Sequence, residues 1–446
     1  MNKKLIYPLI ISLFIVSLGF IIFQFTHIKD EDTNYQLKER KGALAGTEEY
    51  KNTRATASRL KMAIQENPAD HKSMLGLAAL YIQEGRITGD YMYYNPAAMQ
   101  QVNNVLKADS NNFQALTYKA LIYLSQHHFS DGLVVAEKAK RINPYNAFIY
   151  GILIDANVEM GDYTAAVGYA DQMVSIRPDI RSYSRISYLR ELHGDMPGAI
   201  DAMKMAVDAG MPGDEGTEWA RIQLGHLYEN TGDLRNAEMH YRIALQERPD
   251  YPYALAGLAH IESANKNYGT AINYLLKADS LVNDYSFKEE LVDLYKLSGI
   301  QDKSIALAKA VIEGMSKDAQ SGLKNENLGH YADRELAYAY LKMKQDDKAL
   351  SHAMTEYERR PKNIDVNETV AWVLYNDNKP AQALPYLKEA LKTNNKNPTL
   401  LCRAGLIYAK TGEKEKAKTF LSEALKNNPN ISQELRSETI TTLNSL

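Results

Sequence analysis

The sequence has very little cysteine: among its 446 residues only Cys402 carries a thiol. A single cysteine excludes an intramolecular disulfide framework and any metal site built from several thiolates. The segment TLLCRAGLIY around it reads as an amphipathic helix. We therefore interpret Cys402 as a small packed side chain and not as a reactive thiol.

The sequence also lacks an excess of either charge. It has 52 Lys and Arg against 55 Asp and Glu, which gives a net charge of −3 and a pI of about 6.4. A protein that binds a phosphate backbone needs positive charge to neutralise it. The composition therefore predicts that nucleic acid is not a partner.

Catalytic motifs are missing as well. The sequence has no glycine-rich phosphate loop, no HExxH helix, no GxSxG elbow and no strand-rich segment that could form an α/β catalytic core. We predict a protein that is not an enzyme, with no catalytic residues, no cofactor and no small-molecule substrate.

The N-terminus differs from the rest of the chain. Leu5 to Phe23 is an uncharged run of nineteen residues that would rise about 28 Å as a helix, close to the thickness of a bilayer core. We predict a cytoplasmic start at 1–4, a transmembrane anchor or uncleaved signal at 5–25, and a polar, flexible stalk at 26–46.

The placement of lysine predicts the orientation of this anchor. Lys3 and Lys4 precede the apolar run, whereas Lys29 follows it among acidic residues, so the N-terminus is expected in the cytoplasm. We expect a single-pass membrane protein with the rest of the chain on the exported, periplasmic or extracytoplasmic, side. The alternatives are a cleaved secretory signal and the reverse topology, with the chain facing the cytosol.

One pattern is repeated within the chain. Residues 224–250 read LGHLYENTGDLRNAEMHYRIALQERPD and residues 404–430 read AGLIYAKTGEKEKAKTFLSEALKNNPN, with Gly, Tyr, Gly, Ala, Ala and Pro in register. Prolines or their equivalents recur mostly every 33 or 34 residues. This pattern resembles the tetratricopeptide repeat, in which a helix A, a tight turn and a helix B precede a proline that begins the next unit.

The resemblance implies an all-α fold. We expect a right-handed superhelical α-solenoid of about ten helix–turn–helix repeats over residues 47–429. One N-terminal transmembrane helix precedes the array, a lone helix is expected at about 47–67, and a C-terminal capping segment follows at 430–446.

Small residues recur where the two helices of a unit would touch. Alanine fills two such positions, where a larger side chain would overpack. These alanines are Ala139, Ala166, Ala237, Ala244, Ala271, Ala278, Ala349, Ala383, Ala390, Ala417 and Ala424. Glycines stand where helix A ends, a place that suits the left-handed backbone. They are Gly161, Gly194, Gly232, Gly299 and Gly412.

Two units are longer than the others. One contains about eight extra residues around ITGDYMYY at 87–94, and the other about eleven around KDAQSGLKNEN at 317–327. The first insertion is expected either to lengthen the turn between two helices or to form a contact loop on the rim of the array.

In the family, one face of helix A generally lines the concave surface that holds peptides. Mapped onto this sequence, the resemblance implies a partner-binding groove of aromatic residues with scattered positive charge, which are residue types common in binding hot spots. The alternative is that tyrosine is simply the packing residue that this chain favours. The groove residues are Arg181, Arg185, Tyr188, Trp219, His226, Asn230, Tyr253, His260, Tyr331, Arg334, Tyr338, Lys342, Trp372, Tyr375, Asn376, Arg403 and Lys410.

The ten histidines raise the question of a metal site. His127 and His128 lie in a predicted turn and are interpreted as surface residues. His226 and His260 occupy the same position of adjacent units, so stacking should place them side by side. A metal ion shared by the two is the alternative there, but we favour polar residues that line the groove, and no metal site is predicted.

Together these features favour a membrane-anchored scaffold that binds partner proteins or peptides on its concave face, without catalysis of its own. The alternative is a non-catalytic accessory subunit of an envelope enzyme complex, for example of a cell-wall hydrolase or transferase. A receptor for chaperone C-terminal tails is disfavoured, because the lysine and asparagine clamp of such receptors has no counterpart in this sequence.

Overall fold

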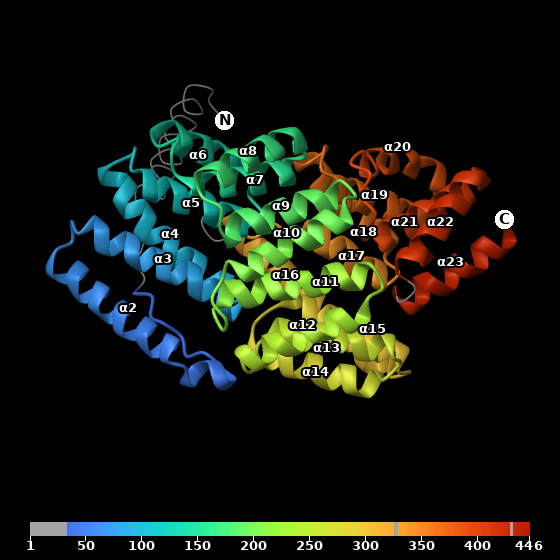
Figure 1. The fold of residues 1–446 in the computed structure, drawn as a ribbon, viewed down its shortest axis with the longest axis horizontal. Helices are drawn as coiled ribbons and strands as arrows, with labels where there is room; N and C mark the ends of the chain where they lie inside the picture. The colour runs from blue at the N-terminus through green and yellow to red at the C-terminus, as the bar shows by residue number, and fades with distance from the viewer. Residues whose placement is uncertain (1–33, 325–328, 429–430) are drawn as a thin grey trace, which may run out of the picture. The chain divides into compact units, whose positions relative to one another are not determined.

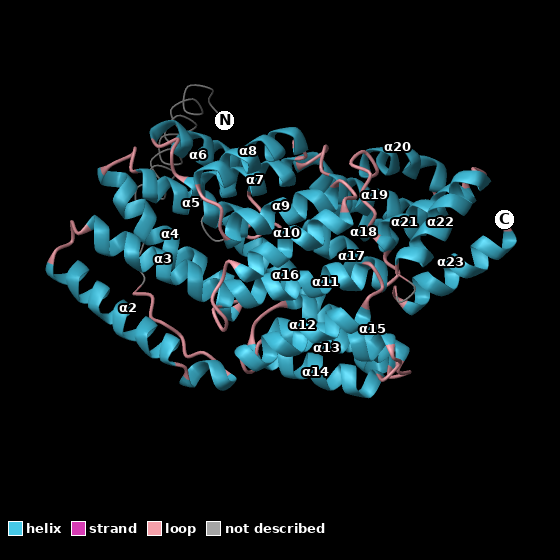
Figure 2. Ribbon diagram, viewed as in Figure 1, coloured by secondary structure: helices cyan, strands magenta, loops and turns pink. Residues whose placement is uncertain are grey.

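The computed structural model describes residues 34–324, 329–428 and 431–446. Within them the chain forms 22 α-helices and a short 3-10 helix, Gly42–Gly46, and no β-strand (Figures 1 and 2). The all-α class is confirmed. No helix in these ranges is both long and apolar enough to cross a membrane. The predicted cytoplasmic start, 1–4, and anchor, 5–25, lie outside the described residues.

Residues Glu39–Leu446 form one compact unit in which α3 to α22 pair along the chain as ten helical hairpins. The first helices are α3 (His71–Thr88), α5 (Phe113–Ser125), α7 (Ala147–Met160), α9 (Ile180–Leu192), α11 (Glu215–Asn230), α13 (Pro252–Ala264), α15 (Tyr285–Leu297), α17 (Asp333–Lys342), α19 (Ile364–Asn376) and α21 (Pro398–Lys410). The number of hairpins agrees with the number of repeats that the sequence predicts.

The second helices of the hairpins follow short turns. They are α4 (Tyr91–Ala108), α6 (Phe129–Ile142), α8 (Tyr163–Ile176), α10 (Met196–Asp208), α12 (Leu234–Glu247), α14 (Tyr268–Leu281), α16 (Gln301–Lys324), α18 (Asp346–Arg359), α20 (Pro380–Ala390) and α22 (Lys414–Asn427). A lone helix, α2 (Glu48–Glu66), precedes the array, and α23 (Gln433–Ser445) packs on α21 and α22 after it.

Small residues allow the two helices of each hairpin to pack closely. All eleven alanines predicted at these positions have no exposed surface. Gly225 meets the ring of Tyr241, and a Cβ atom at Gly225 would overlap that ring. The helices therefore approach until a backbone lies against a buried aromatic ring, a contact that a larger residue would prevent.

The five glycines predicted at the ends of first helices all have positive φ, for example 80° at Gly161 and 84° at Gly412. Their surroundings differ. A Cβ atom at Gly161 would overlap the carbonyl group of Lys362, whereas Gly412 has no heavy atom within 4 Å of that position. Gly161 thus serves both the left-handed turn and a close approach to a distant part of the chain.

That close approach is part of a regular pattern in which residues about 200 positions apart meet. His127 Nδ1 lies 2.8 Å from the carbonyl oxygen of Tyr331, 204 residues later, and the amide of Ile364 donates a hydrogen bond to the Tyr163 hydroxyl across 201 residues. With a repeat of 33 or 34 residues, this offset is about six repeats. The hairpins therefore wind into a spiral whose successive windings touch.

The contact between windings corrects the interpretation of His127 and His128 as surface residues. The His128 side chain is only 6% exposed and its ring stacks on that of Tyr331 at 4.1 Å between centroids. Burial lowers the pKa of His128. Both histidines lie in the turn between α5 and α6, and the next winding covers that turn.

The expectation of a turn or rim loop at 87–94 is wrong. Only Gly89 and Asp90 separate α3 from α4, and the tyrosine-rich part of the segment begins α4. Tyr94 has no exposed surface, and its ring lies 6.0 Å from that of Tyr81. The extra residues lengthen both helices, because their tyrosines pack within the hairpin. Likewise α16 continues through much of the second insertion, as far as Lys324.

The end of the predicted flexible stalk is packed on the array. Arg40 is 4% exposed and donates two hydrogen bonds to the buried carboxylate of Glu84, and a third to Glu49. Leu44 is also buried. A bidentate pair of this kind fixes the geometry of both side chains, so the described residues from Arg40 onward belong to the folded unit. Cys402 is fully buried, as expected for a packed thiol.

Candidate partner-binding surface

Packing between hairpins decides which helices face inward. Most first helices of consecutive hairpins pack on one another, as α7 does on α9 and α17 on α19, more closely than the second helices do. A stack whose first helices lie closer together curves toward them. We name the side lined by the first helices from α7 to α21 the inner surface; it is the side that the repeat resemblance predicts to be concave.

Five predicted groove residues from α17, α19 and α21 form a continuous cluster, which we name the arginine–aromatic ladder. The Arg334 and Arg403 guanidinium groups lie 5.8 and 5.2 Å from the centre of the Tyr338 ring, and Arg403 lies 5.1 Å from that of Trp372. Trp372 in turn stacks on Tyr375 at 4.9 Å. Such cation–π and stacking contacts hold planar groups in fixed positions from which they can contact a partner.

His226 and His260 lie side by side, with ring centres 5.8 Å apart, as their repeat positions predict. Glu229 lies between them, and its Oε2 atom is 3.0 Å from His226 Nδ1 and 3.3 Å from His260 Nδ1. Burial alone would raise the pKa of Glu229, but the charge of His260 and the hydrogen bond from His226 lower it far below its usual range.

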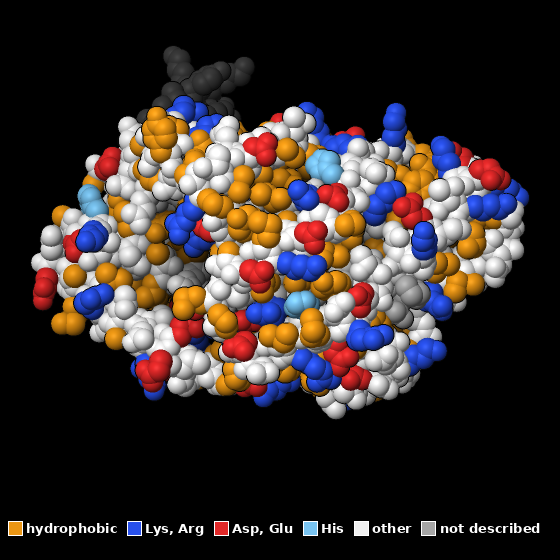
Figure 3. All heavy atoms as spheres, in the orientation of Figure 1, with side chains coloured by type: hydrophobic (Ala, Val, Ile, Leu, Met, Phe, Trp, Pro, Cys, Tyr) orange, Lys and Arg blue, Asp and Glu red, His pale blue; other side chains and the backbone are white. Residues whose placement is uncertain are grey.

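The scattered positive charge predicted for the groove is offset by carboxylates. Arg185 Nη2 lies 2.6 Å from Asp155, and Lys342 Nζ lies 2.9 Å from Asp293. Arg403 pairs in the same way with Glu368, at 2.9 Å. These partners lie on neighbouring first helices, which is why the sequence of one helix does not reveal them. Figure 3 likewise shows both signs of charge interspersed on the face that it presents.

Other acidic groups on the inner surface have little compensation. Burial raises the pKa of Glu191, and the charge of Asp365 adds to that effect. Tyr188, three residues earlier on the same helix, is 37% exposed. Burial also raises the pKa of Glu289 to about 7. The charge of Lys342 lowers this pKa, but neighbouring carboxylates raise it and so oppose the effect of Lys342. The inner surface thus combines aromatic rings with acidic groups whose ionised form a nearby cation would stabilise.

Several predicted groove residues lie elsewhere or act differently. Trp219 is covered by the guanidinium of Arg86 from α3, 5.4 Å from its ring. Tyr253 packs beside Phe287 at 5.7 Å. Tyr331 lies between the windings. The remaining members have smaller roles. Arg181 lies over the Phe148 ring, and Asn230 donates a hydrogen bond to Glu191. Asn376 donates a hydrogen bond to the Trp372 carbonyl, and Lys410 is exposed at the end of α21.

Sequence reasoning missed the acidic residues of this surface. Glu191 follows Tyr188 by three positions, Glu229 follows His226 by three, and Glu368 precedes Trp372 by four. Residues three or four apart share one face of a helix, so helical periodicity could have found these residues. The groove positions that the repeat resemblance implies do not include these acidic residues.

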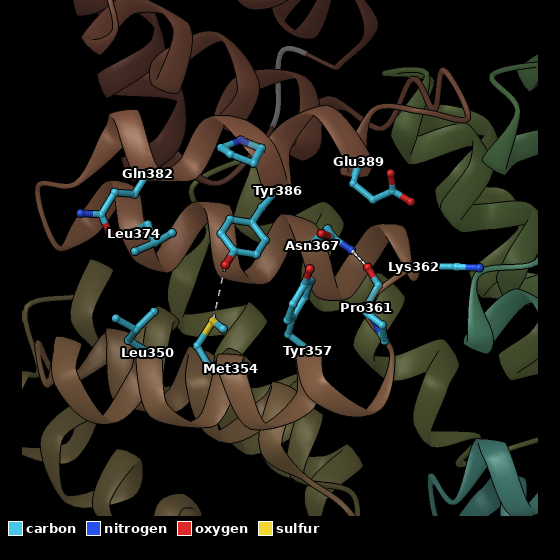
Figure 4. A pocket seen from close by; sticks show the side chains of 11 residues that line it. Leu350, Met354, Tyr357, Pro361, Lys362, Asn367, Leu374, Gln382, Tyr386 and Glu389 are labelled. Atoms are coloured by element: carbon cyan, nitrogen blue, oxygen red, sulfur yellow. Dashed lines mark hydrogen bonds between the residues drawn. The ribbon is translucent and has the colours of Figure 1, made fainter.

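The grooves in the described part of the unit include a larger and a smaller one. The larger, about 840 Å³, runs between α18 and α20 and is lined mainly by apolar and aromatic side chains (Figure 4). In it the Tyr386 hydroxyl points toward the Met354 sulfur, 4.0 Å away, and Asn367 donates to the Pro361 carbonyl. The smaller, about 600 Å³, lies along α13, α15 and residues 431–436 and reaches His260. Only the smaller groove reaches the polar clusters described above.

Ten stacked helical hairpins with small residues at their contacts define an α-solenoid repeat protein. Sequence models of the tetratricopeptide repeat match residues 222–284 and 374–437. The chain therefore contains tetratricopeptide repeats, and repeats of this family form scaffolds for protein interaction. No curated protein sequence matches the chain significantly.

Solved structures resemble parts of the chain at low sequence identity. A tetratricopeptide repeat protein from Parabacteroides merdae is 16% identical, covers 55% of this chain and 92% of its own, and has a TM-score of 0.42. PilF of Pseudomonas aeruginosa is 13% identical, with 45% and 90% covered and a TM-score of 0.37. The human IFIT1 dimer with PPP-AAAA is 13% identical, with 77% and 80% covered and a TM-score of 0.47.

Proposed function

We propose that the protein is a membrane-anchored interaction scaffold that binds a protein or peptide partner on its inner surface and has no catalytic activity of its own. The apolar run from Leu5 to Phe23 supports the anchor, and the lysines before it support placing the repeat array on the exported side. In this proposal the array winds as a right-handed superhelix, as the repeat resemblance implies.

The observation that carries the proposal is the arginine–aromatic ladder on α17, α19 and α21. Arg and aromatic side chains dominate binding hot spots because they bury much area with few rotatable bonds. Tyr338, Trp372 and Arg403 are each only partly buried, and their mutual contacts hold them in place before a partner arrives. Preorganised side chains lose less conformational freedom on binding.

Acidic groups on the inner surface favour a partner segment that carries Lys or Arg. Glu191 and Glu289 have raised pKa values because burial disfavours their charge and cations nearby are few. A basic side chain placed beside either carboxylate would favour its ionised form. Binding is therefore expected to weaken with salt and to release protons near neutral pH.

The test is capture of partners by the tagged full-length protein from detergent-solubilised membranes. The Tyr338→Ala, Trp372→Ala double variant should lose the specific partners, whereas Tyr145→Ala should keep them. Tyr145 is 84% exposed in the turn between α6 and α7, so it is a matched aromatic control away from the ladder. Circular dichroism should show the same helicity in all three proteins.

Capture that is unchanged in the double variant would contradict the proposal, as would capture that does not respond to salt. Removal of residues 1–25 should release the protein from the membrane fraction without abolishing capture. A truncated chain that stays with the membrane would contradict the proposed anchor.

A further inference from the structure

Four polar side chains from three consecutive first helices converge on the inner surface. His226 and Glu229 come from α11, His260 from α13 and Glu290 from α15. One ligand atom from each of His226, Glu229 and His260 can be chosen so that all three lie within 4.8 Å of one another. No two of these helices are joined into one hairpin, so the cluster is built by the stacking of repeats.

The spacing within this cluster suits a small metal ion. Zn²⁺ binds imidazole nitrogen and carboxylate oxygen at about 2.0–2.2 Å, which places the ligand atoms of a tetrahedral site about 3.3 Å apart. The Oε2 atom of Glu229 lies 3.0 Å from His226 Nδ1 and 3.3 Å from His260 Nδ1. A metal ion could therefore be held with little movement of the backbone.

The surroundings orient these ligand atoms as metal sites require. His260 presents its Nε2 atom to Glu290 Oε2 at 3.0 Å while its Nδ1 atom faces Glu229. The buried Tyr241 hydroxyl donates to Glu229 Oε2 at 2.8 Å. A carboxylate that holds the far nitrogen of a histidine, and a donor that fixes the ligating carboxylate, are the usual outer partners of bound metal ions.

The cluster is also open to solvent on one side. The His226 and His260 side chains are 36% and 35% exposed, and the groove of about 600 Å³ includes both His260 and Glu290 in its lining. A metal ion has a path of entry, and water can fill a fourth position. By contrast, another histidine–carboxylate pair, His352 and Asp333, already has Arg359 as a cation on the same carboxylate.

We propose that His226, Glu229 and His260 bind a divalent transition-metal ion, Zn²⁺ in the first place, and that Glu290 positions His260. Two imidazoles and one carboxylate form a ligand set typical of zinc, with other divalent transition ions as competitors. The ion joins α11 to α13, and through Glu290 to α15, so it cross-links three repeats.

The test is zinc binding by the full-length protein, carrying a tag without histidine, after treatment with EDTA. Titration calorimetry with ZnCl₂ should give one equivalent bound with a micromolar or lower Kd. Glu229→Gln and His260→Ala should each weaken binding at least 100-fold, and Glu290→Gln about 10- to 100-fold. His352→Ala, which removes a histidine of similar surroundings elsewhere, should leave the Kd unchanged.

Absence of zinc binding would overturn the proposal and leave an ion-pair cluster without a metal. Binding that survives Glu229→Gln and His260→Ala, or that is lost equally in His352→Ala, would overturn it as well. If a ligand variant fails to fold, the absorption spectrum of Co²⁺ bound to the wild-type protein tests the site instead. A tetrahedral site gives visible absorption bands that one equivalent of Zn²⁺ removes, and their absence would contradict the site.

Discussion

Glu159 at the end of α7 and Arg360 in the turn after α18 form an ion pair, although 201 residues separate them in the chain. Arg360 is 6% exposed and also binds Glu356 of α18. Burial raises the pKa of Glu159, and the charge of Arg360 only partly offsets that effect. The pair marks the contact between two windings of the spiral, and the stability of the array is expected to depend on such contacts.

Asn363 tests that dependence. Its Oδ1 atom caps α19, and its Nδ2 atom donates to the carbonyl oxygens of Val158 and Glu159 in the earlier winding. Asn397 caps α21 in the same way. Loss of a cap costs about 1 kcal/mol and loss of each hydrogen bond about 1 kcal/mol. We expect Asn363→Ala to lower the free energy of unfolding by about 2–3 kcal/mol and Asn397→Ala by about 1 kcal/mol, as measured by urea unfolding. Equal losses in the two variants would contradict the contact between windings.

A comparison of Gly161 with Gly412 distinguishes the cost of a left-handed backbone from the cost of a steric overlap between windings. Both have positive φ, so alanine at either position should cost about 1–2 kcal/mol. Only Gly161 also faces the carbonyl of Lys362, with no room for a Cβ atom. Gly161→Ala should therefore lower the thermal midpoint clearly more than Gly412→Ala. Similar midpoints in differential scanning calorimetry would mean that the windings do not press together at this turn.

The buried pair of Arg40 and Glu84 should matter more than any surface pair nearby. Removal of one partner leaves a buried charge uncompensated, so Arg40→Ala is expected to cost about 3–5 kcal/mol. Arg54 pairs with Glu39 in the open, with more than half of each side chain exposed, and Arg54→Ala should cost less than about 1 kcal/mol. Chemical unfolding of the two variants measures the difference, and a small loss for Arg40→Ala would show that residues near 40 are not part of the folded unit.

Glu289 predicts a dependence of stability on pH. Its pKa is about 7 in the folded protein, above the usual 4.5, so the folded state keeps a proton that the unfolded state releases between these values. Stability therefore falls as pH rises from about 4.5 to about 7. We expect Glu289→Gln to raise the thermal midpoint at pH 8 but not at pH 4.5. Glu313→Gln, at an exposed site of α16, is the control and should not change the thermal midpoint at either pH. A rise in the midpoint of Glu289→Gln that is equal at both pH values would contradict the raised pKa.

The sequence by itself determined the contacts within each repeat. Alanines such as Ala237 and glycines such as Gly225 recur at fixed spacing because neighbouring helices must approach closely, and that spacing predicts the ten hairpins and the side-by-side placement of His226 and His260. Each repeat contacts mainly its neighbours, so the residues of adjacent repeats are enough to predict such contacts.

Only the tertiary structure decided which distant residues meet. The position of Tyr331 against His128, and of Asn363 against Val158, depends on small rotations that accumulate over about six repeats, and no local pattern records their sum. The same holds for charge: Arg185, predicted as part of the scattered positive charge of the groove, is paired with Asp155 from the preceding hairpin. Local periodicity fixed the helices and their nearest contacts, whereas the curvature of the whole stack brought the windings together and set the charge of the inner surface.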